Sequence, residues 1–368
     1  MSAETDVKSD AKSDAKSNAK SDAKSTGKRE AKSEAKRAKK AEGKRSAKPP
    51  KGKRAKKAAR VASPAPAPER PSAEWIAVDW GTTYLRAWAM RGETPVGEVR
   101  SDAGMNALET REDFEGALFE AIAAWLPADE AARLDVVACG MVGARQGWRE
   151  APYLRTPTVP RGETRSVPTS RPGVVVEILP GIAQDDPPDV IRGEETQIAG
   201  LLAREPDFEG VVCLPGTHTK WVRVAQGRIV GFRTAMTGEI FALLSQRSVL
   251  RHDIDADWDE GIFAAAVAEA EADPAHAPLA LFSVRARNLL QGAILGECRA
   301  RLSGALIGAE LAALAEFRQA AAVRIVGAPG IAANYAKALG VVGQGAILHD
   351  GADLTLAGLA AARRELAP

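Results

Sequence analysis

A glycine- and threonine-rich turn holds the first residues that could do chemistry. In the stretch WIAVDWGTTYLRAWAM, Asp79 ends a strand-like run, and Gly81, Thr82 and Thr83 separate it from the next strand-like run. Backbone N–H groups of such a turn, with the threonine hydroxyls, can face a phosphate group. A carboxylate at a strand end suits a hydrated Mg²⁺ that bridges phosphates. A hairpin whose Asp and Thr merely satisfy the turn backbone is the competing interpretation.

A second turn of this kind occurs in LPGTHTKW, where it supplies Gly216, Thr217, His218 and Lys220. These residues suit the other side of a polyphosphate, although a structural role for His218 is the alternative. The string is not a P-loop, because GxxxxGK[ST] is absent. Each turn follows the first strand of a three-strand meander that leads into helices. This duplication predicts two similar lobes with a cleft between them.

Paired glutamates stand between the two turns, in the string RGEETQ. Glu194 or Glu195 could accept the proton of an attacking hydroxyl group in phosphoryl transfer. Acids in the first turn of a helix also compensate the helix dipole, which is the alternative interpretation. Further along, VGAPG supplies Gly327 and Gly330 before a helix, where a flat base could approach the backbone; a simple tight turn is equally compatible.

A polar loop in CGMVGARQGWREAPY leaves a buried strand and carries Arg145 and Gln146. Arg145 is a natural partner for a substrate carboxylate, through two parallel charge-assisted hydrogen bonds. A solvated surface arginine is the alternative. Asn106, in SDAGMNAL, and Arg86, in the second strand-like run, complete the predicted substrate-binding residues.

The elements that position these residues indicate an α/β fold. Strands are predicted at 75–80 and 174–179, and a helix at 112–125. From Glu239 onward the chain is predicted to be largely helical, apart from a strand in VRIVGAPG. We expect a first lobe over 74–188 and a second over 189–368, with the last helix able to pack back on the first lobe.

The charge of the chain is unevenly distributed. Residues 1–73 hold 22 Lys and Arg against 9 Asp and Glu, a net charge of +13, and the remainder holds 28 against 39, a net charge of −11. The repeat AKSDAKSNAKSDAKS has almost no large apolar residue, so residues 1–73 are predicted to be a disordered tail that ends in a Pro/Ala linker. A basic segment of this kind could contact nucleic acid or another polyanion.

Composition also restricts the location of the protein. The chain shows no apolar stretch of membrane-spanning length and no apolar signal-peptide core, so we predict a cytoplasmic protein with no membrane contact. Cys139, Cys213 and Cys298 lack metal-ligand spacing and are predicted to be buried thiols in a reducing compartment.

Taken together, the order of these motifs resembles that of the actin, hexokinase and sugar-kinase superfamily, in which two ribonuclease-H-like lobes hold ATP in a central cleft. More closely, CGMVGARQGWREAPYL, DVIRGEETQIAGLL and CLPGTHTKWV are similar to strings of the 2-dehydro-3-deoxygalactonokinase family, and the resemblance runs from about Trp75 to the C-terminus. It implies ATP-dependent phosphorylation of the 6-hydroxyl of 2-dehydro-3-deoxy-D-galactonate. Asp79 would then order Mg²⁺, the two glycine-threonine turns would hold phosphates, and Glu194 or Glu195 would take the hydroxyl proton.

Two alternatives stay open from the sequence. The acceptor could be another ketodeoxy sugar acid or a hexose. A protein of a different class, associated with nucleic acid through its basic tail and without catalysis, is the other alternative. The presence of Asp79, the glycine-threonine turn and the paired glutamates favours the kinase. A homo-oligomeric state is compatible with either.

Overall fold

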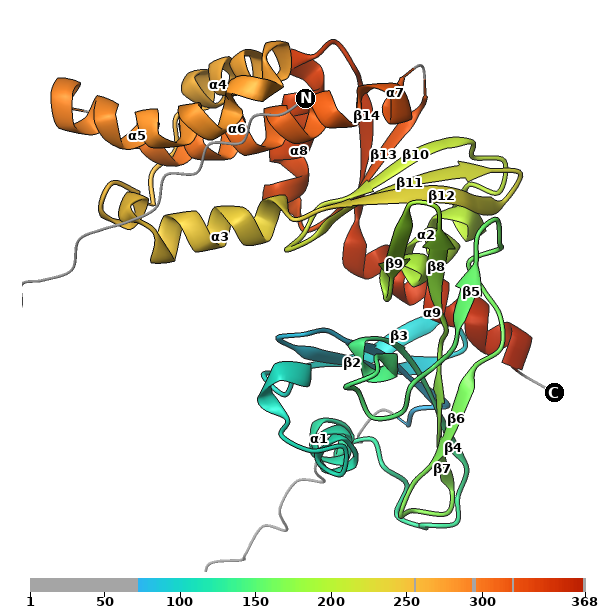
Figure 1. Ribbon diagram of the computed structural model, residues 1–368. Helices are drawn as coiled ribbons and strands as arrows, with labels where there is room; N and C mark the ends of the chain where they lie inside the picture. The colour runs from blue at the N-terminus through green and yellow to red at the C-terminus, as the bar shows by residue number, and fades with distance from the viewer. Residues whose placement is uncertain (1–71, 255, 293–295, 320, 367–368) are drawn as a thin grey trace, which may run out of the picture. The chain divides into compact units, whose positions relative to one another are not determined.

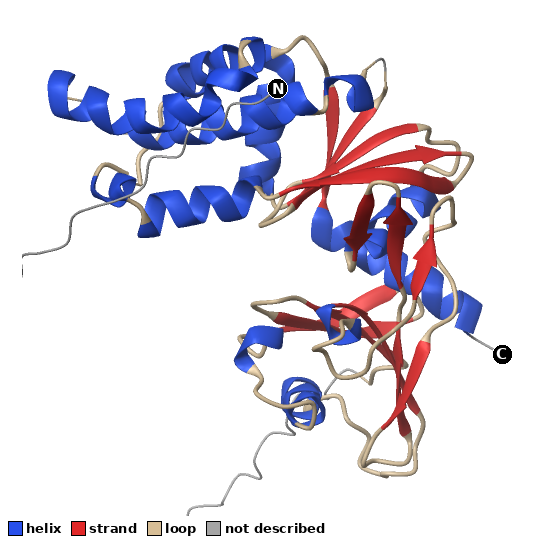
Figure 2. Ribbon diagram, viewed as in Figure 1, coloured by secondary structure: helices blue, strands red, loops and turns tan. Residues whose placement is uncertain are grey.

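The computed structural model describes residues 72–254, 256–292, 296–319 and 321–366 (Figure 1). Residues 1–71 of the predicted tail and linker lie outside the described residues. The described chain forms three sheets and the helices around them (Figure 2). Two of the sheets carry the candidate site, and each is built from one of the predicted meanders.

The first sheet begins with the predicted meander and adds three later strands. In spatial order its strands are β3 (Thr94–Ser101), β2 (Leu85–Arg91), β1 (Trp75–Trp80), β4 (Leu134–Gly140), β7 (Val174–Ile178) and β6 (Arg165–Pro168). Strands β1, β2 and β3 pair in antiparallel fashion, and β4 and β7 extend the sheet in parallel from β1. Both faces of β1 are buried, as is typical of a strand at the centre of an α/β sheet.

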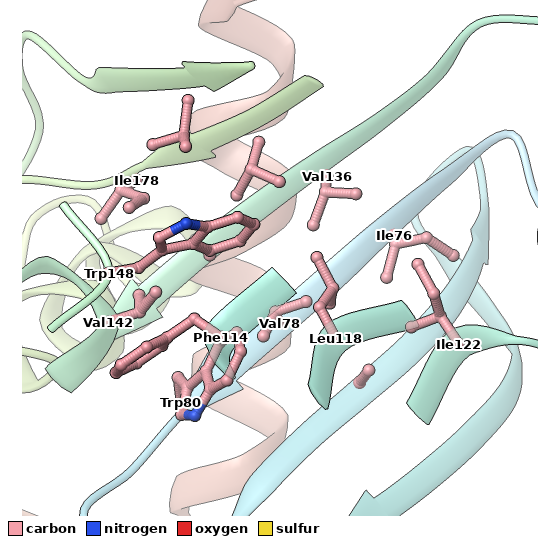
Figure 3. Packing of buried hydrophobic residues seen from close by; sticks show 14 of the residues in the cluster. Ile76, Val78, Trp80, Phe114, Leu118, Ile122, Val136, Val142, Trp148 and Ile178 are labelled. Atoms are coloured by element: carbon pink, nitrogen blue, oxygen red, sulfur yellow. The ribbon is translucent and has the colours of Figure 1, made fainter. Parts of the chain in front are cut away.

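The alternation of side chains along β1 explains this burial, because successive side chains point to opposite faces. Ile76, Val78 and Trp80 belong to one hydrophobic cluster, which α1 (Asp113–Ile122) covers with its apolar side chains. In that cluster Trp80 lies with its ring centroid 5.1 Å from that of Phe114 (Figure 3). On the opposite face, Trp75 packs with residues of the C-terminal helix α9 (Gly351–Leu366).

The second sheet repeats the same strand order about its own first strand. Its strands are β12 (Arg228–Ala235), β11 (Thr219–Ala225), β10 (Gly210–Leu214), β13 (Val323–Gly327) and β14 (Ala346–Asp350). The three strands of its meander are antiparallel, and β13 and β14 continue it in parallel. Both sheets therefore have the ribonuclease-H-like arrangement, and the predicted duplication is confirmed.

Helices cover both faces of the second sheet. On one face lie α4 (Glu260–Ala272), α6 (Glu297–Ala313) and α8 (Pro329–Val341), which share a hydrophobic cluster with β10, β11 and β13. On the other face α2 (Glu194–Arg204) and the start of α9 contribute to a separate cluster with the same strands. Helix α9 thus contacts both sheets, and it packs along α2, the helix that begins with the paired glutamates.

The remaining elements of the described residues lie outside these two sheets. They are the third sheet, β5 (Tyr153–Arg155), β8 (Gly181–Asp185) and β9 (Pro188–Ile191), the helices α3 (Thr237–Arg247), α5 (Ala277–Gln291) and α7 (Ala315–Arg318), and the 3₁₀ turns at 105–107, 141–143, 249–252 and 274–276. Helices α3 and α5 pack against α6. The hairpin of β8 and β9 spans the predicted lobe boundary at 188/189. Sequence reasoning missed β14, whose Ile347 and Leu348 are both about half exposed, because its side chains do not alternate between apolar and polar.

Two further observations concern predictions from composition. Cys139, Cys213 and Cys298 are all buried free thiols, as expected. None of the helices in the described ranges combines the length and the apolar character that crossing a membrane requires.

Candidate active site

Asp79 lies at the end of β1, the strand that pairs with β2 on one side and with β4 on the other. It stands opposite Arg86 of β2 and beside Cys139 of β4 in the strand register. The Arg86 guanidinium donates from Nη2 to Asp79 Oδ2 at 2.5 Å, and the Cys139 thiol lies 4.0 Å from Oδ1. Burial raises the pKa of Asp79 above its ordinary value, Arg86 opposes this, and the charge of Glu194 adds to it. Asp79 therefore faces one cation and one further carboxylate.

The paired glutamates occupy the first turn of α2, directly after Gly193. Gly193 has φ of 107°, a conformation that strongly favours glycine, and its N–H points back at the new helix. The Glu195 carboxylate accepts that N–H at 2.9 and 2.7 Å from its two oxygens. Burial, and then the nearby charge of Glu194, raise the pKa of Glu195 to about 7. Glu195 is thus a buried carboxyl that braces the turn.

Glu194 has a different environment from that of its neighbour. Its side chain is 22 % exposed, and Oε1 lies 2.9 Å from the Lys220 Nζ at the start of β11. Its second oxygen, Oε2, accepts the Arg192 backbone N–H at 3.0 Å. The Lys220 contact joins the RGEETQ turn to the second phosphate turn. Glu194 therefore contacts Lys220 directly, its charge acts on Asp79, and it is the more accessible carboxylate of the pair.

The two predicted phosphate turns are supported in the same way, by the segment that follows the third strand of each meander. In the first sheet, Met105 N–H donates to the Gly81 carbonyl and Asn106 N–H to the Thr82 carbonyl, each at 3.0 Å. A Cβ at Gly104 would lie 2.1 Å from the backbone of Thr83, so the two segments touch directly. Asn106 therefore sits against the first turn.

In the second sheet the supporting segment is the start of α3. Glu239 N–H donates to the Thr217 carbonyl at 2.8 Å, and a Cβ at Gly238 would lie 2.1 Å from the Gly216 carbonyl oxygen. The Glu239 carboxylate also lies 2.6 Å from His218 Nε2. Thr82, Thr83, Thr217 and His218 are all exposed at their turns, so their hydroxyl and imidazole groups are accessible to a ligand.

A cavity of about 600 Å³ opens beside the second phosphate turn. Its lining residues include the predicted Gly216, Thr217 and Gly330, together with Thr237, Trp258 and Tyr335. Gly330 leaves open space where a side chain would stand, whereas Gly327 lies against Pro215 and does not line the cavity. The volume is within the range of small-molecule sites, and the mixed aromatic and polar lining suits a nucleoside.

A buried polar network lies beneath this cavity. Glu310 of α6 accepts the Trp221 indole N–H at 2.6 Å and the Tyr335 hydroxyl at 2.9 Å. The Tyr335 hydroxyl also lies 2.8 Å from Thr219 Oγ1, at the second phosphate turn. Because every buried group here has a partner, the network holds the wall of the cavity and the turn in one arrangement.

Of the four predicted substrate residues, Arg145 and Gln146 lie on the loop after β4, whereas Arg86 lies on β2 and Asn106 in the turn at 105–107. Arg145 and Gln146 are exposed, and the Arg145 carbonyl accepts a hydrogen bond from the Arg111 guanidinium at 2.7 Å. Arg192 connects this loop to the paired glutamates. Its guanidinium donates from Nη2 to the Ala151 carbonyl at 2.9 Å and lies 4.2 Å above the Tyr153 ring.

Sequence reasoning missed several residues of the cavity wall. Tyr335 follows the predicted Gly330 closely in the string GIAANY, so the motif could have been extended to include it in the predicted nucleoside site. Trp258 and Arg299 belong to none of the predicted site motifs, and their place at the cavity depends on the tertiary structure.

The residues that the structure describes are compatible with a hydrated Mg²⁺ and offer no site for a metal held by protein ligands alone. No group of three or more His, Cys, Asp or Glu side chains that could hold a metal ion occurs within the part of the chain that the structure describes. Mg²⁺ usually keeps several waters and uses one or two carboxylates with substrate phosphates. The buried Asp79 carboxylate fits this role, because a cation beside it would offset the cost of its burial.

Two sheets with the same strand order, Asp79 at the end of β1 and the paired glutamates at the start of α2 define the class of actin-like and sugar-kinase folds. Residues 79–362 match the family described as 2-keto-3-deoxy-galactonokinase, and the chain belongs to this family. A Rhizobium meliloti protein named as a probable 2-dehydro-3-deoxygalactonokinase is 41 % identical over 304 residues, which cover 80 % of this chain and 98 % of that protein.

Two further comparisons agree with this membership. The 2-dehydro-3-deoxygalactonokinase of Escherichia coli K12 is 33 % identical over 276 residues, covering 74 % of this chain and 91 % of that protein. A crystal structure of a Sinorhizobium meliloti protein, provisionally assigned as a 2-dehydro-3-deoxygalactonokinase, superposes with a TM-score of 0.73 at 39 % identity. It covers 80 % of this chain and 97 % of that one.

Proposed function

We propose that this protein transfers the γ-phosphate of ATP to the 6-hydroxyl group of 2-dehydro-3-deoxy-D-galactonate. Membership of the family and the names of the two curated relatives support this assignment. The observation that carries it in the structure is the ion pair of Glu194 with Lys220, which joins the RGEETQ turn to the second glycine-threonine turn, with the charge of Glu194 acting on Asp79 next to the first turn. A hydroxyl acceptor and a polyphosphate donor both need groups of these kinds at one place.

In this proposal ATP binds next to the second sheet. The cavity beside Gly216 and Thr217 receives the nucleoside, and the turn itself holds phosphate oxygens through its N–H groups and the Thr217 hydroxyl. Thr82 and Thr83 of the first turn face the transferred phosphate. Lys220 exchanges part of its contact with Glu194 for a phosphate oxygen when ATP binds. Mg²⁺, held by Asp79 and phosphate oxygens, would neutralise charge on the phosphates.

Glu194 is the general base in this proposal. It accepts the proton of the 6-hydroxyl as the substrate oxygen forms a bond to the γ-phosphorus, and the bond from that phosphorus to the bridging oxygen breaks to release ADP. Glu194 is preferred to Glu195 because it is accessible, whereas both oxygens of Glu195 already accept the Gly193 N–H. Glu195 then keeps the turn in position.

The test is ADP release on a panel of ketodeoxy sugar acids and hexoses, with Glu194→Gln as the diagnostic variant. Loss of a general base lowers kcat by about 10²- to 10⁴-fold, and we expect the KM for ATP to change by only a few fold. Glu120→Gln, at an exposed position on α1, is the matched control and should retain wild-type kcat. Absence of turnover on every acid would refute the assignment, and near-normal kcat in Glu194→Gln would place the base elsewhere.

The proposal also covers the location of the protein, the contacts of its tail and its oligomeric state. We place the reaction in the cytoplasm, which the three free buried thiols support. Contact of the basic tail with nucleic acid or another polyanion is a separate hypothesis that rests on the net charge of +13 over residues 1–73. A homo-oligomeric state stays a prediction.

A further inference from the structure

A second hollow, of about 500 Å³, lies in the first lobe beside the loop that follows β4. Three arginines line it, Arg111, Arg149 and Arg165, with Glu150 and Tyr153 among the other lining residues. The three guanidinium groups come from separate parts of the chain, before α1, after β4 and at the start of β6. One acid against three arginines leaves the hollow with a net positive charge.

Two of these arginines are available to a ligand. Arg111 is engaged, since it donates to the Arg145 carbonyl and so anchors the loop. Throughout the ranges that the structure describes, no ion pair and no side-chain hydrogen bond involves Arg149 or Arg165, and both side chains are exposed. Unpaired guanidinium groups around one hollow present several N–H donors, in the planar geometry that carboxylates prefer.

Arg192 links the proposed base, Glu194, to the hollow. The Arg192 backbone N–H bonds to the Glu194 carboxylate, while its guanidinium bonds to the Ala151 carbonyl and lies 3.3 Å from the Tyr153 hydroxyl. Ala151 and Tyr153 both line the hollow. The path from the Glu194 carboxylate to the Ala151 carbonyl therefore consists of hydrogen bonds of 3.0 and 2.9 Å and one arginine side chain of roughly 6–8 Å, which together span at most about 12–14 Å.

That length matches the acceptor. A six-carbon ketodeoxy acid carries its carboxylate on C1 and its reacting hydroxyl on C6, and the five carbon–carbon bonds between them span roughly 6–7 Å when extended. A hydrogen bond of about 3 Å at each end brings the span from base to guanidinium to about 12–13 Å. We infer that Arg149 and Arg165 bind the C1 carboxylate of the sugar acid and so select acids over neutral sugars, in place of the predicted Arg145. This inference rests on the proposed function, and it assigns the end of the substrate that is remote from Glu194.

The experiment compares Arg149→Gln, Arg165→Gln and Arg145→Gln with the wild-type protein, using ADP release with the ketodeoxy acid and with its C1 amide. Losing one charge-assisted bond should raise the KM for the acid by about 10- to 100-fold in the first two variants, and should leave the KM for ATP unchanged. The amide lacks the charge, so the wild-type protein should have a high KM for it. Arg149→Gln and Arg165→Gln should not raise the KM for the amide any further. Arg133→Gln is the control, because this exposed residue directly precedes β4, at the opposite end of that strand from the Arg145 loop.

The outcomes distinguish a failure of the proposed function from a failure of the carboxylate site. No turnover of any ketodeoxy acid by the wild-type protein refutes the proposed function, and the inference with it. Turnover with an unchanged KM for the acid in Arg149→Gln and Arg165→Gln refutes the inference alone, as does a rise confined to Arg145→Gln. An equal loss on acid and amide also refutes it, because a structural defect would not distinguish the two.

Discussion

Replacing Glu195 by glutamine should remove one component of the pH dependence of stability. Burial and the charge of Glu194 raise the pKa of Glu195 to about 7 in the folded protein, against an ordinary value of 4.5. Glutamine keeps the size of the side chain and an oxygen that can accept the Gly193 N–H, but it carries no proton to release. The variant therefore isolates the ionisation of this one group.

The direction and size of the effect follow from the two pKa values. Below pH 4.5 both the folded and the unfolded protein hold the proton. Between pH 4.5 and about 7 the unfolded chain has released it and the folded protein has not, so the stability that Glu195 contributes falls as the pH rises. At about 1.4 kcal/mol per pH unit, the loss reaches about 3 kcal/mol by pH 7 and stays constant above it.

The measurement is urea unfolding followed by tryptophan fluorescence, at several pH values from 4.5 to 8. The free energy of unfolding of Glu195→Gln, minus that of the wild-type protein, should grow by about 3 kcal/mol across this range. Glu120→Gln, on the exposed face of α1, should follow the wild-type curve. Parallel curves for the wild-type protein and Glu195→Gln would refute the reasoning, because Glu195 would then ionise near its ordinary pKa.

Two further predictions concern other parts of the chain. Gly238→Ala places a methyl group 2.1 Å from the Gly216 carbonyl oxygen, so the start of α3 must move off the second phosphate turn. The KM for ATP should rise by about 5- to 150-fold, since such overpacking costs about 1–3 kcal/mol. Gly340→Ala is the control, because Gly340 in α8 has open space around it, and it should leave the KM for ATP unchanged. An unaltered KM for ATP in Gly238→Ala would contradict a role of the Gly238–Gly216 contact in positioning the turn. Deleting residues 1–71 should abolish DNA retardation without changing ADP release; retardation by the truncated protein would exclude a tail-borne contact.

Local sequence predicted the parts of the site that a short string determines. A glycine-threonine turn between two strands depends on residues within a few positions, so the turns at Gly81 and Gly216 could be identified from their own motifs. The repeated order of strands also followed from the pattern, because hydrophobic alternation marks each strand. The third sheet and β14 were not predicted, because apolar and polar side chains do not alternate clearly along such short strands.

The tertiary structure decided which of these residues meet and how their environments differ. Glu194 and Glu195 are adjacent in the chain and equivalent in any motif, yet one contacts Lys220 of another element and the other is enclosed and braces Gly193. The hollow at Arg149 and Arg165 likewise joins segments that no spacing relates. The sequence alone therefore determined the turns, the duplicated strands and the family. Burial, the pKa of Glu195 and the proposed carboxylate site depended on long-range packing, because solvent exposure and charge neighbours exist only once distant segments are brought together.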